Sequence, residues 1–196
     1  MTSANAGYGG ALRGSPACHV GGIDVKKKVV RKHNSSGNCF VCGINNDWGL
    51  HSNFYELEDG SIAALITADF KHQSYPGRVH GGVICSMLDE TMGRAINVSE
   101  PDTWAVTADI NVRYRHPVPY DVPLIVTGRV TRNTRLIFDG EGEIILPDGT
   151  VAATGHARYM KQPLSVIGDL ATNGDIWELV ESPDDPAEID IPELKK

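Results

Sequence analysis

The sequence predicts an α+β fold, in which a long antiparallel sheet curls around one central helix. Two observations lead to this prediction. Apolar residues recur at steps of three and four between residues 82 and 98, the period of a helix with one buried face. Segments with strand composition lie on both sides of this helix, and the later ones run to about ten residues, longer than the usual five or six. Long strands around a single helix favour a curled sheet.

Each predicted element rests on a local pattern. Asp59-Gly60 marks a hairpin between the first two strands, and the turn at residues 147–149 precedes the last strand. The buried face of the helix is predicted from its repeat of apolar residues: Ile84, Met87, Leu88, Thr91, Ala95 and Val98. The predicted strands are 50–57, 61–70, 104–114, 124–134, 136–146 and 150–160. A short strand or helix is expected near 25–30, and a short helix near 174–181.

Charge divides the chain into three parts. Residues 1–37 carry six Lys or Arg and one Asp, and we expect a flexible basic arm. Residues 38–162 form the predicted domain. Residues 163–196 are predicted to be an acidic extension; from 162 to 196 the chain has nine Asp or Glu and two Lys, which equals the net charge of −7.

Composition excludes several functional classes. No broad basic surface is expected, which argues against a nucleic-acid-binding protein. No run approaches the roughly 20 apolar residues that span a bilayer, and the first 20 residues do not resemble a signal peptide. Four cysteines in a chain of this length fit a cytoplasmic protein with reduced thiols better than a disulfide scaffold.

The segment 80–93, which reads HGGVICSMLDETMG, carries the most chemical information. Gly81 and Gly82 would expose backbone N–H groups at the positive end of the helix, where a ligand oxygen can approach. Asp89 falls on the apolar side of the same helix, where a carboxylate needs either a hydrogen-bonding partner or a catalytic role. Glu90 is spaced to form a surface ion pair with Arg94. A hydrogen-bond donor and a base on one helix indicate acyl transfer.

Four motifs carry a resemblance to a known family. They are CFVCG at 39–43, YPGRVHGG at 75–82, LDETMG at 88–93 and NVRYRHPV at 111–118. In this order the motifs resemble the hotdog-fold acyl-CoA thioesterases, in particular the phenylacetyl-CoA thioesterase-like branch. The resemblance runs from about residue 39 to residue 161. It implies a hotdog fold and hydrolysis of an acyl-CoA thioester.

The resemblance also implies roles for individual residues. Asp89 matches the catalytic carboxylate, and the Gly81 N–H matches the group that polarises the thioester carbonyl. Thr107 matches a hydroxyl that holds the attacking water. The family often has Asn or Gln in the loop before the motif histidine, so Gln73 and His80 are further candidate catalytic residues. Gly82 and Glu90 are expected to contact the substrate. Such proteins are dimers or dimers of dimers in which each site draws residues from two chains, so we expect a homo-oligomer.

Coenzyme A carries phosphates, which bind well to arginine side chains. Five arginines lie between residues 113 and 135: Arg113, Arg115, Arg129, Arg132 and Arg135. We favour Arg132 and Arg135 as substrate contacts because they flank a turn between two long strands.

Some alternatives stay open. Cys39 and Cys42 have zinc-ligand spacing, and Cys18 with His19, or His33, would be the further ligands. Because the resemblance treats residues 39–43 as a structural turn, we predict no metal and no cofactor. The alternative functions are an enoyl-thioester hydratase or dehydratase, and a non-catalytic acyl-CoA-binding protein. The sequence leaves open the acyl group and whether Asp89 acts as a base or a nucleophile.

Overall fold

The computed structural model describes residues 25–163, 177–192 and 194. Within this part, one α-helix and two short 3-10 helices accompany ten strands. The helices are η1 Phe70–His72, α1 Gly81–Arg94 and η2 Ala95–Val98. The strands are β1 Val25–Lys32, β2 Ser35–Ser36, β3 Asn53–Leu57, β4 Ile62–Thr67, β5 Thr103–Tyr114, β6 Pro123–Asn133, β7 Ile137–Ile145, β8 Val151–Pro163, β9 Trp177–Glu178 and β10 Glu188–Ile191.

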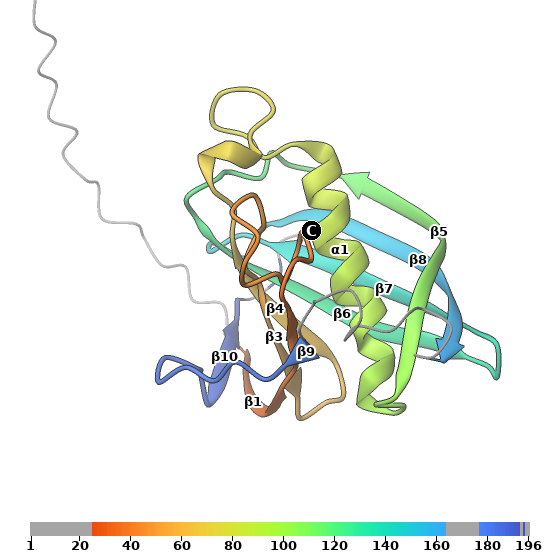
Figure 1. Cartoon of the computed structure of the whole chain (residues 1–196). Coiled ribbons are helices and arrows are strands. Elements are labelled where there is room, and N and C mark those ends of the chain that lie inside the picture. The colour runs from red at the N-terminus through yellow and green to blue at the C-terminus, as the bar shows by residue number, and fades with distance from the viewer. Residues whose placement is uncertain (1–24, 164–176, 193, 195–196) are drawn as a thin grey trace, which may run out of the picture.

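Eight strands form one sheet in the order β10-β1-β3-β4-β6-β7-β8-β5, and neighbouring strands are antiparallel. Figure 1 shows this sheet curving around α1, which lies across its concave face. The strands β2 and β9 form a separate two-stranded pair. The predicted fold class is confirmed: it is α+β, with a long antiparallel sheet wrapped around one central helix.

The central helix follows the predicted pattern closely. Ile84, Met87, Leu88 and Thr91 are buried, as the helical period predicted. The α-helix ends at Arg94, and the last predicted turn is a 3-10 helix over residues 95–98. The strands β5 to β8 have between 9 and 13 residues, which confirms the prediction of unusually long strands.

Glycines in the sheet let the helix approach closely. A Cβ atom on Gly128 would lie 2.6 Å from the backbone oxygen of Thr91. A Cβ atom on Gly142 or Gly155 would lie 3.0 Å from an atom of the Met92 side chain. The backbone contact at Gly128 leaves no room for a methyl group, and at Gly142 and Gly155 a methyl group would require Met92 to shift. Met92, which is fully buried, fills the space that the glycines leave.

The N-terminal boundary predicted for the domain differs from the structure. Residues 25–32, assigned to the flexible arm, form β1 and pair with β3 and β10. Their partner β10 comes from the predicted acidic extension. Ile189 and Ile191 of β10 are buried in an apolar cluster with Tyr55 and Leu57, and Lys26 lies opposite Asp190 in the register, with Nζ 3.8 Å from Oδ2. The basic and acidic ends of the chain therefore complement each other across two strands.

The helix expected near 174–181 is wrong over the part that can be checked. Residues 174–176 lie outside the described residues, and Trp177–Glu178 is the strand β9. Trp177 pairs with Ser36, and its ring lies 4.8 Å from that of Trp104. Pairing with β2 and aromatic contact override the local preference for a helix. Among the described residues, no helix is long and apolar enough to cross a membrane.

Candidate active site

The start of α1 presents a backbone donor. His80 is the N-cap, and its Nδ1 accepts a hydrogen bond of 2.9 Å from the Gly82 N–H. The Gly81 N–H points out of the first turn and has no acceptor among the residues that the structure describes. Tyr114, on β5, donates from its hydroxyl to the Gly81 carbonyl oxygen at 2.8 Å. The Gly81 N–H is thus a free donor at the positive end of the helix dipole.

Asp89 is half-buried two turns further along α1. Its Oδ1 accepts a hydrogen bond from Thr107 Oγ1 at 2.9 Å and one from the Tyr159 hydroxyl at 3.2 Å. The same Tyr159 hydroxyl lies 2.9 Å from the Asp89 backbone oxygen. Burial raises the pKa of Asp89, although both hydrogen bonds act in the opposite direction. A carboxyl with a raised pKa is a stronger base when it is ionised.

A bulge in β5 brings Thr107 and Tyr114 to the same face. In a regular strand, residues seven apart point to opposite faces of the sheet. The pairing of β5 with β8 shifts by one residue between Thr107 and Asp109, so Ala108 is the extra residue. Both side chains therefore face α1, with Thr107 near Asp89 and Tyr114 near Gly81.

Asp89 lines a cavity of about 450 Å³. Thr107 and Tyr159 share this cavity, together with Trp104 and Trp177. A second hollow of about 290 Å³ lies at the start of the helix and is lined by Gly81, Ile84, Tyr114, Arg78 and Arg115, among others. Gly81 and Asp89 are eight residues apart, which is about 12 Å along a helix axis. Within one chain, the free N–H and the carboxylate thus open into different hollows.

Arg94 closes one wall of the Asp89 cavity. Its Nε donates to Glu90 at 2.9 Å, which confirms the predicted pair. The location differs from the prediction, because Arg94 is buried rather than on the surface. Nη1 donates to the Asn34 carbonyl oxygen at 2.7 Å, and the guanidinium lies 4.2 Å from the centre of the Phe54 ring. These contacts stabilise the buried charge and tie α1 to residues 34–42.

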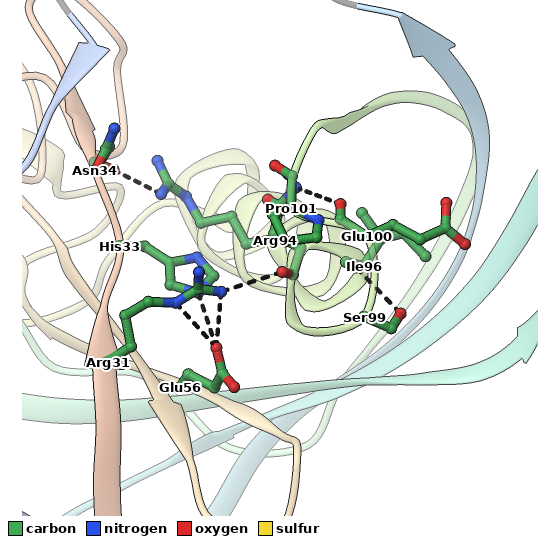
Figure 2. Close-up of polar contacts among 10 residues, drawn as sticks. Arg31, His33, Asn34, Glu56, Arg94, Ile96, Ser99, Glu100 and Pro101 are labelled. Atoms are coloured by element: carbon green, nitrogen blue, oxygen red, sulfur yellow. Dashed lines mark hydrogen bonds and ion pairs between the residues drawn. The ribbon is translucent and has the colours of Figure 1, made fainter.

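A second polar cluster lies beside Arg94. Figure 2 shows Arg31 and His33 both directed at Glu56, while Arg94 reaches toward Asn34. Arg31 donates to Glu56 Oε2 at 2.9 Å, and His33 Nε2 lies 3.8 Å from the same oxygen. Burial, together with the nearby Arg94 and Arg31 charges, lowers the pKa of His33 to about 4. His33 is therefore neutral near pH 7.

The remaining predicted residues occupy three places. Gln73 forms a bridge with Val79, so its backbone lies close to His80 and the helix start. Gly82 is exposed in the first turn of α1. Arg132 and Arg135 are exposed around the turn between β6 and β7, and they are not among the residues that line the Asp89 cavity.

Sequence reasoning missed several neighbours of these residues. Tyr159 reaches Asp89 because β8 pairs with β5 and places it opposite Thr107, a relation that no local pattern reveals. Tyr114 contacts Gly81 from 33 positions away along the chain, which no local pattern reveals either. Arg78 lines the hollow at the helix start, although it stands only three residues before Gly81. Its closeness in sequence to the glycines was the available signal.

Comparison of the sequence with known proteins finds one matching family and two similar thioesterases. Residues 76–153 match the family described as the thioesterase superfamily. Mouse acyl-coenzyme A thioesterase THEM4 is 29% identical over 107 residues, which cover 55% of this chain and 44% of THEM4. Rat THEM4 is 28% identical over 79 residues, 40% of this chain and 33% of that protein. The chain thus spans less than half the length of the curated relatives it matches.

Solved structures agree with this family. A thioesterase superfamily protein of known crystal structure is 30% identical, with a TM-score of 0.57 over 62% of this chain and 59% of that one. The Escherichia coli PaaI protein from the phenylacetic acid degradation operon is 17% identical, with a TM-score of 0.53 over 58% of this chain and 80% of that one. At this identity the PaaI likeness supports the fold alone. The hotdog fold and the resemblance to its thioesterases are confirmed.

Proposed function

We propose that this chain, whose residues 76–153 match the thioesterase superfamily, is an acyl-CoA thioesterase that hydrolyses its substrate to a free acid and coenzyme A. The observation that carries the proposal is the placement of Asp89. Its carboxylate lines a cavity, is held by two hydroxyl donors, and has a pKa raised by burial. The named relatives support the same reaction class, since mouse and rat THEM4 are acyl-coenzyme A thioesterases.

In this mechanism the thioester oxygen accepts a hydrogen bond from the free Gly81 N–H. Negative charge that develops on this oxygen is stabilised there, an effect worth about 3–4 kcal/mol for one donor. Thr107 and Tyr159 both engage Oδ1 of Asp89, so they fix the carboxylate and leave Oδ2 for a water molecule. Asp89 takes the proton of this water as it attacks the carbonyl carbon; the tetrahedral intermediate then breaks its C–S bond, and coenzyme A leaves as the thiol with the proton from the Asp89 carboxyl. Direct attack by Asp89, through a mixed anhydride, is the other route that this geometry allows.

The site needs two chains in this proposal. The Gly81 N–H and the Asp89 carboxylate are separated by about 12 Å along α1, whereas both must reach one thioester group. One chain therefore supplies the Gly81 N–H to one site and the Asp89 carboxylate to another. A second copy would supply the missing half of each.

The edge strand β5 gives the second copy a place to bind. It pairs with β8 along one edge, and among the described residues no strand pairs with its other edge. A twelve-residue edge of this kind favours pairing with another strand. If two copies pair antiparallel with Asn111 opposite Asn111, and Ala108 stays outside the register as the bulged residue, Thr107 of one lies opposite Tyr114 of the other. That register brings Asp89 of one copy toward Gly81 of the second copy.

Arginines beside the helix start are suited to the phosphates of coenzyme A. Arg78 and Arg115 line the hollow that contains Gly81. A thioester bound at the Gly81 N–H would extend its coenzyme A portion from this hollow, within reach of both guanidinium groups. Arg132 and Arg135 remain predicted contacts, and a second copy would have to bring them close to the substrate.

The first experiment measures release of the coenzyme A thiol from short, long and aromatic acyl-CoAs by the purified protein. We expect hydrolysis of at least one group of substrates and loss of at least 99% of it in Asp89→Asn. Asp190→Asn is the matched control, because it removes the same charge from an exposed strand far from the cavity. Unchanged turnover in Asp89→Asn would exclude this mechanism.

A second experiment tests whether each site draws on two chains. Asp89→Asn and Gly81→Pro chains are each expected to be inactive. When equal amounts are unfolded and refolded together, half of the dimers are mixed, and each mixed dimer contains one intact site. The expected activity is therefore about one quarter of wild type. Recovery of none, in a mixture that has formed dimers, would mean that both groups act within one chain.

No specific feature of the structure favours the alternatives, a hydratase or a binding protein without activity. The Nδ1 atom of His80 is engaged in capping the helix, which argues against its use as the catalytic base of a hydratase. Conversion of an enoyl thioester without thiol release would nevertheless identify that activity. The cytoplasmic location expected from the cysteine content stays a prediction.

A further inference from the structure

Three potential metal ligands converge on the wall of the Asp89 cavity. The Sγ atoms of Cys39 and Cys42 and a carboxylate oxygen of Glu90 all lie within 4.8 Å of one another. All three residues line the same cavity as Asp89. The proposed hydrolysis uses neither thiol, and Glu90, which pairs with Arg94, brings a carboxylate to the same point.

The turn that carries the thiols is built tightly. The Gly43 N–H donates to the Cys39 carbonyl oxygen at 2.9 Å, and a Cβ atom at Gly43 would lie only 2.2 Å from that oxygen. Glycine is therefore required directly after the second cysteine. This close turn directs both thiols to the same side, as the spacing Cys-x-x-Cys does in zinc sites.

Hydrogen-bond donors already surround the sulfur atoms. Cys39 Sγ accepts from the Val41 N–H at 3.3 Å, and Cys42 Sγ accepts from the Ser36 N–H at 3.5 Å. Arg94 donates to Cys42 Sγ at 3.1 Å. Donors of this kind orient metal-binding groups. They hold both sulfur atoms in position at the wall of the cavity.

We propose that Cys39, Cys42 and Glu90 bind one thiophilic divalent cation, of which Zn²⁺ is the representative. Two thiolates around tetrahedral zinc are about 3.8 Å apart, so the present spacing closes with a shift on the order of 1 Å. The ligands carry a charge of −3 and Arg94 carries +1, which leaves −2 to balance the cation. The fourth position opens into the cavity and is filled by water or by a ligand bound there.

This site goes beyond the proposed hydrolysis and was not expected from the sequence. The sequence suggested Cys18, His19 or His33 as further ligands and favoured a metal-free turn. Cys18 and His19 lie outside the described residues. The third ligand that the structure supplies is instead Glu90, which α1 presents to the turn from 48 positions away along the chain.

The test is a titration of the reduced, chelator-treated full chain with Cd²⁺, which absorbs in the ultraviolet when bound to thiolates. We expect absorption that saturates at one equivalent and competition by Zn²⁺. Cys39→Ser and Cys42→Ser should each lose the saturable signal, and Glu90→Gln should bind at least tenfold more weakly. Cys85→Ser is the matched control, since Cys85 lies on α1 outside this group of ligands.

A second measurement keeps the test independent of whether the variants fold. X-ray absorption of the zinc-loaded wild-type chain should show two sulfur and two oxygen or nitrogen ligands. The proposal is overturned if wild type gives no saturable signal at one equivalent, or if the signal survives in both serine variants. Because all readouts measure metal binding, they stand or fall separately from thioester hydrolysis.

Discussion

Replacing Gly81 by proline would delete one atom of the candidate site with little effect on the fold. Gly81 is the first residue of α1, and proline is well tolerated there because that N–H has no partner within the helix. Proline also requires an extended residue before it, and His80 has φ −64° and ψ 138°. The Cβ atom of proline or alanine also fits, since it would lie no closer than 3.6 Å to Tyr114.

The expected loss of activity follows from the donor that is removed. One hydrogen bond to a developing oxyanion is worth about 2.7–4 kcal/mol, which corresponds to a fall of about 10² to 10³ in kcat. The pyrrolidine ring would also occupy the space into which the thioester oxygen fits, so this range is a minimum. The unfolding temperature should stay within about 3 °C of wild type, because no intramolecular hydrogen bond is lost.

The assay is thiol release from the best acyl-CoA substrate, measured as kcat and KM for wild type, Gly81→Pro and Gly81→Ala. The alanine variant is the control, because it adds a Cβ atom and retains the N–H. Its activity should stay within about threefold of wild type. A folded Gly81→Pro protein that keeps more than a third of wild-type activity would refute the role of this N–H.

Four further results are expected. Asp89→Asn should unfold at a higher temperature than wild type at pH 7. Burial raises the pKa of Asp89 in the folded state above its value in the unfolded state, so wild-type stability falls as the pH rises from the unfolded pKa through the folded one. Below the pKa of an unfolded aspartate, the difference between the two proteins should disappear. Tyr159→Phe should move the acidic limb of the pH–activity profile to higher pH, because the hydrogen bond that it removes lowers the pKa of Asp89. Denaturant unfolding should show a free energy of unfolding lower by about 1–3 kcal/mol. An unchanged pH profile would contradict a role for this hydrogen bond. Gly128→Ala should cost about 1–3 kcal/mol in urea unfolding, because its methyl group would meet the Thr91 backbone; wild-type stability would show that the helix can shift. Arg115→Gln should raise KM for acyl-CoA more than Arg132→Gln does, and the reverse order would transfer phosphate binding to the β6–β7 turn.

Local patterns predicted most of the fold correctly. The helical repeat from Ile84 to Thr91 identified the buried face, and the long segments of strand composition located β5 to β8 with ends that differ by at most three residues. These features depend on neighbours along the chain, so a single sequence contains them. The short strand or helix expected near 25–30 is the strand β1, whereas β10 was missed because it is short and charged and is stabilised by pairing with β1.

The sequence by itself determined which chemical groups this protein offers: the free donor of Gly81, the carboxylate of Asp89 and the thiols of Cys39 and Cys42. Only the tertiary structure decided what surrounds them. Strand pairing brings Tyr159 to Asp89 from 70 positions away, and the bulge at Ala108 turns Thr107 toward the same carboxylate. The length of α1 separates Gly81 from Asp89 by about 12 Å, which makes a second copy necessary in the proposed site. Such relations depend on distances through space, and residue order along the chain does not specify them.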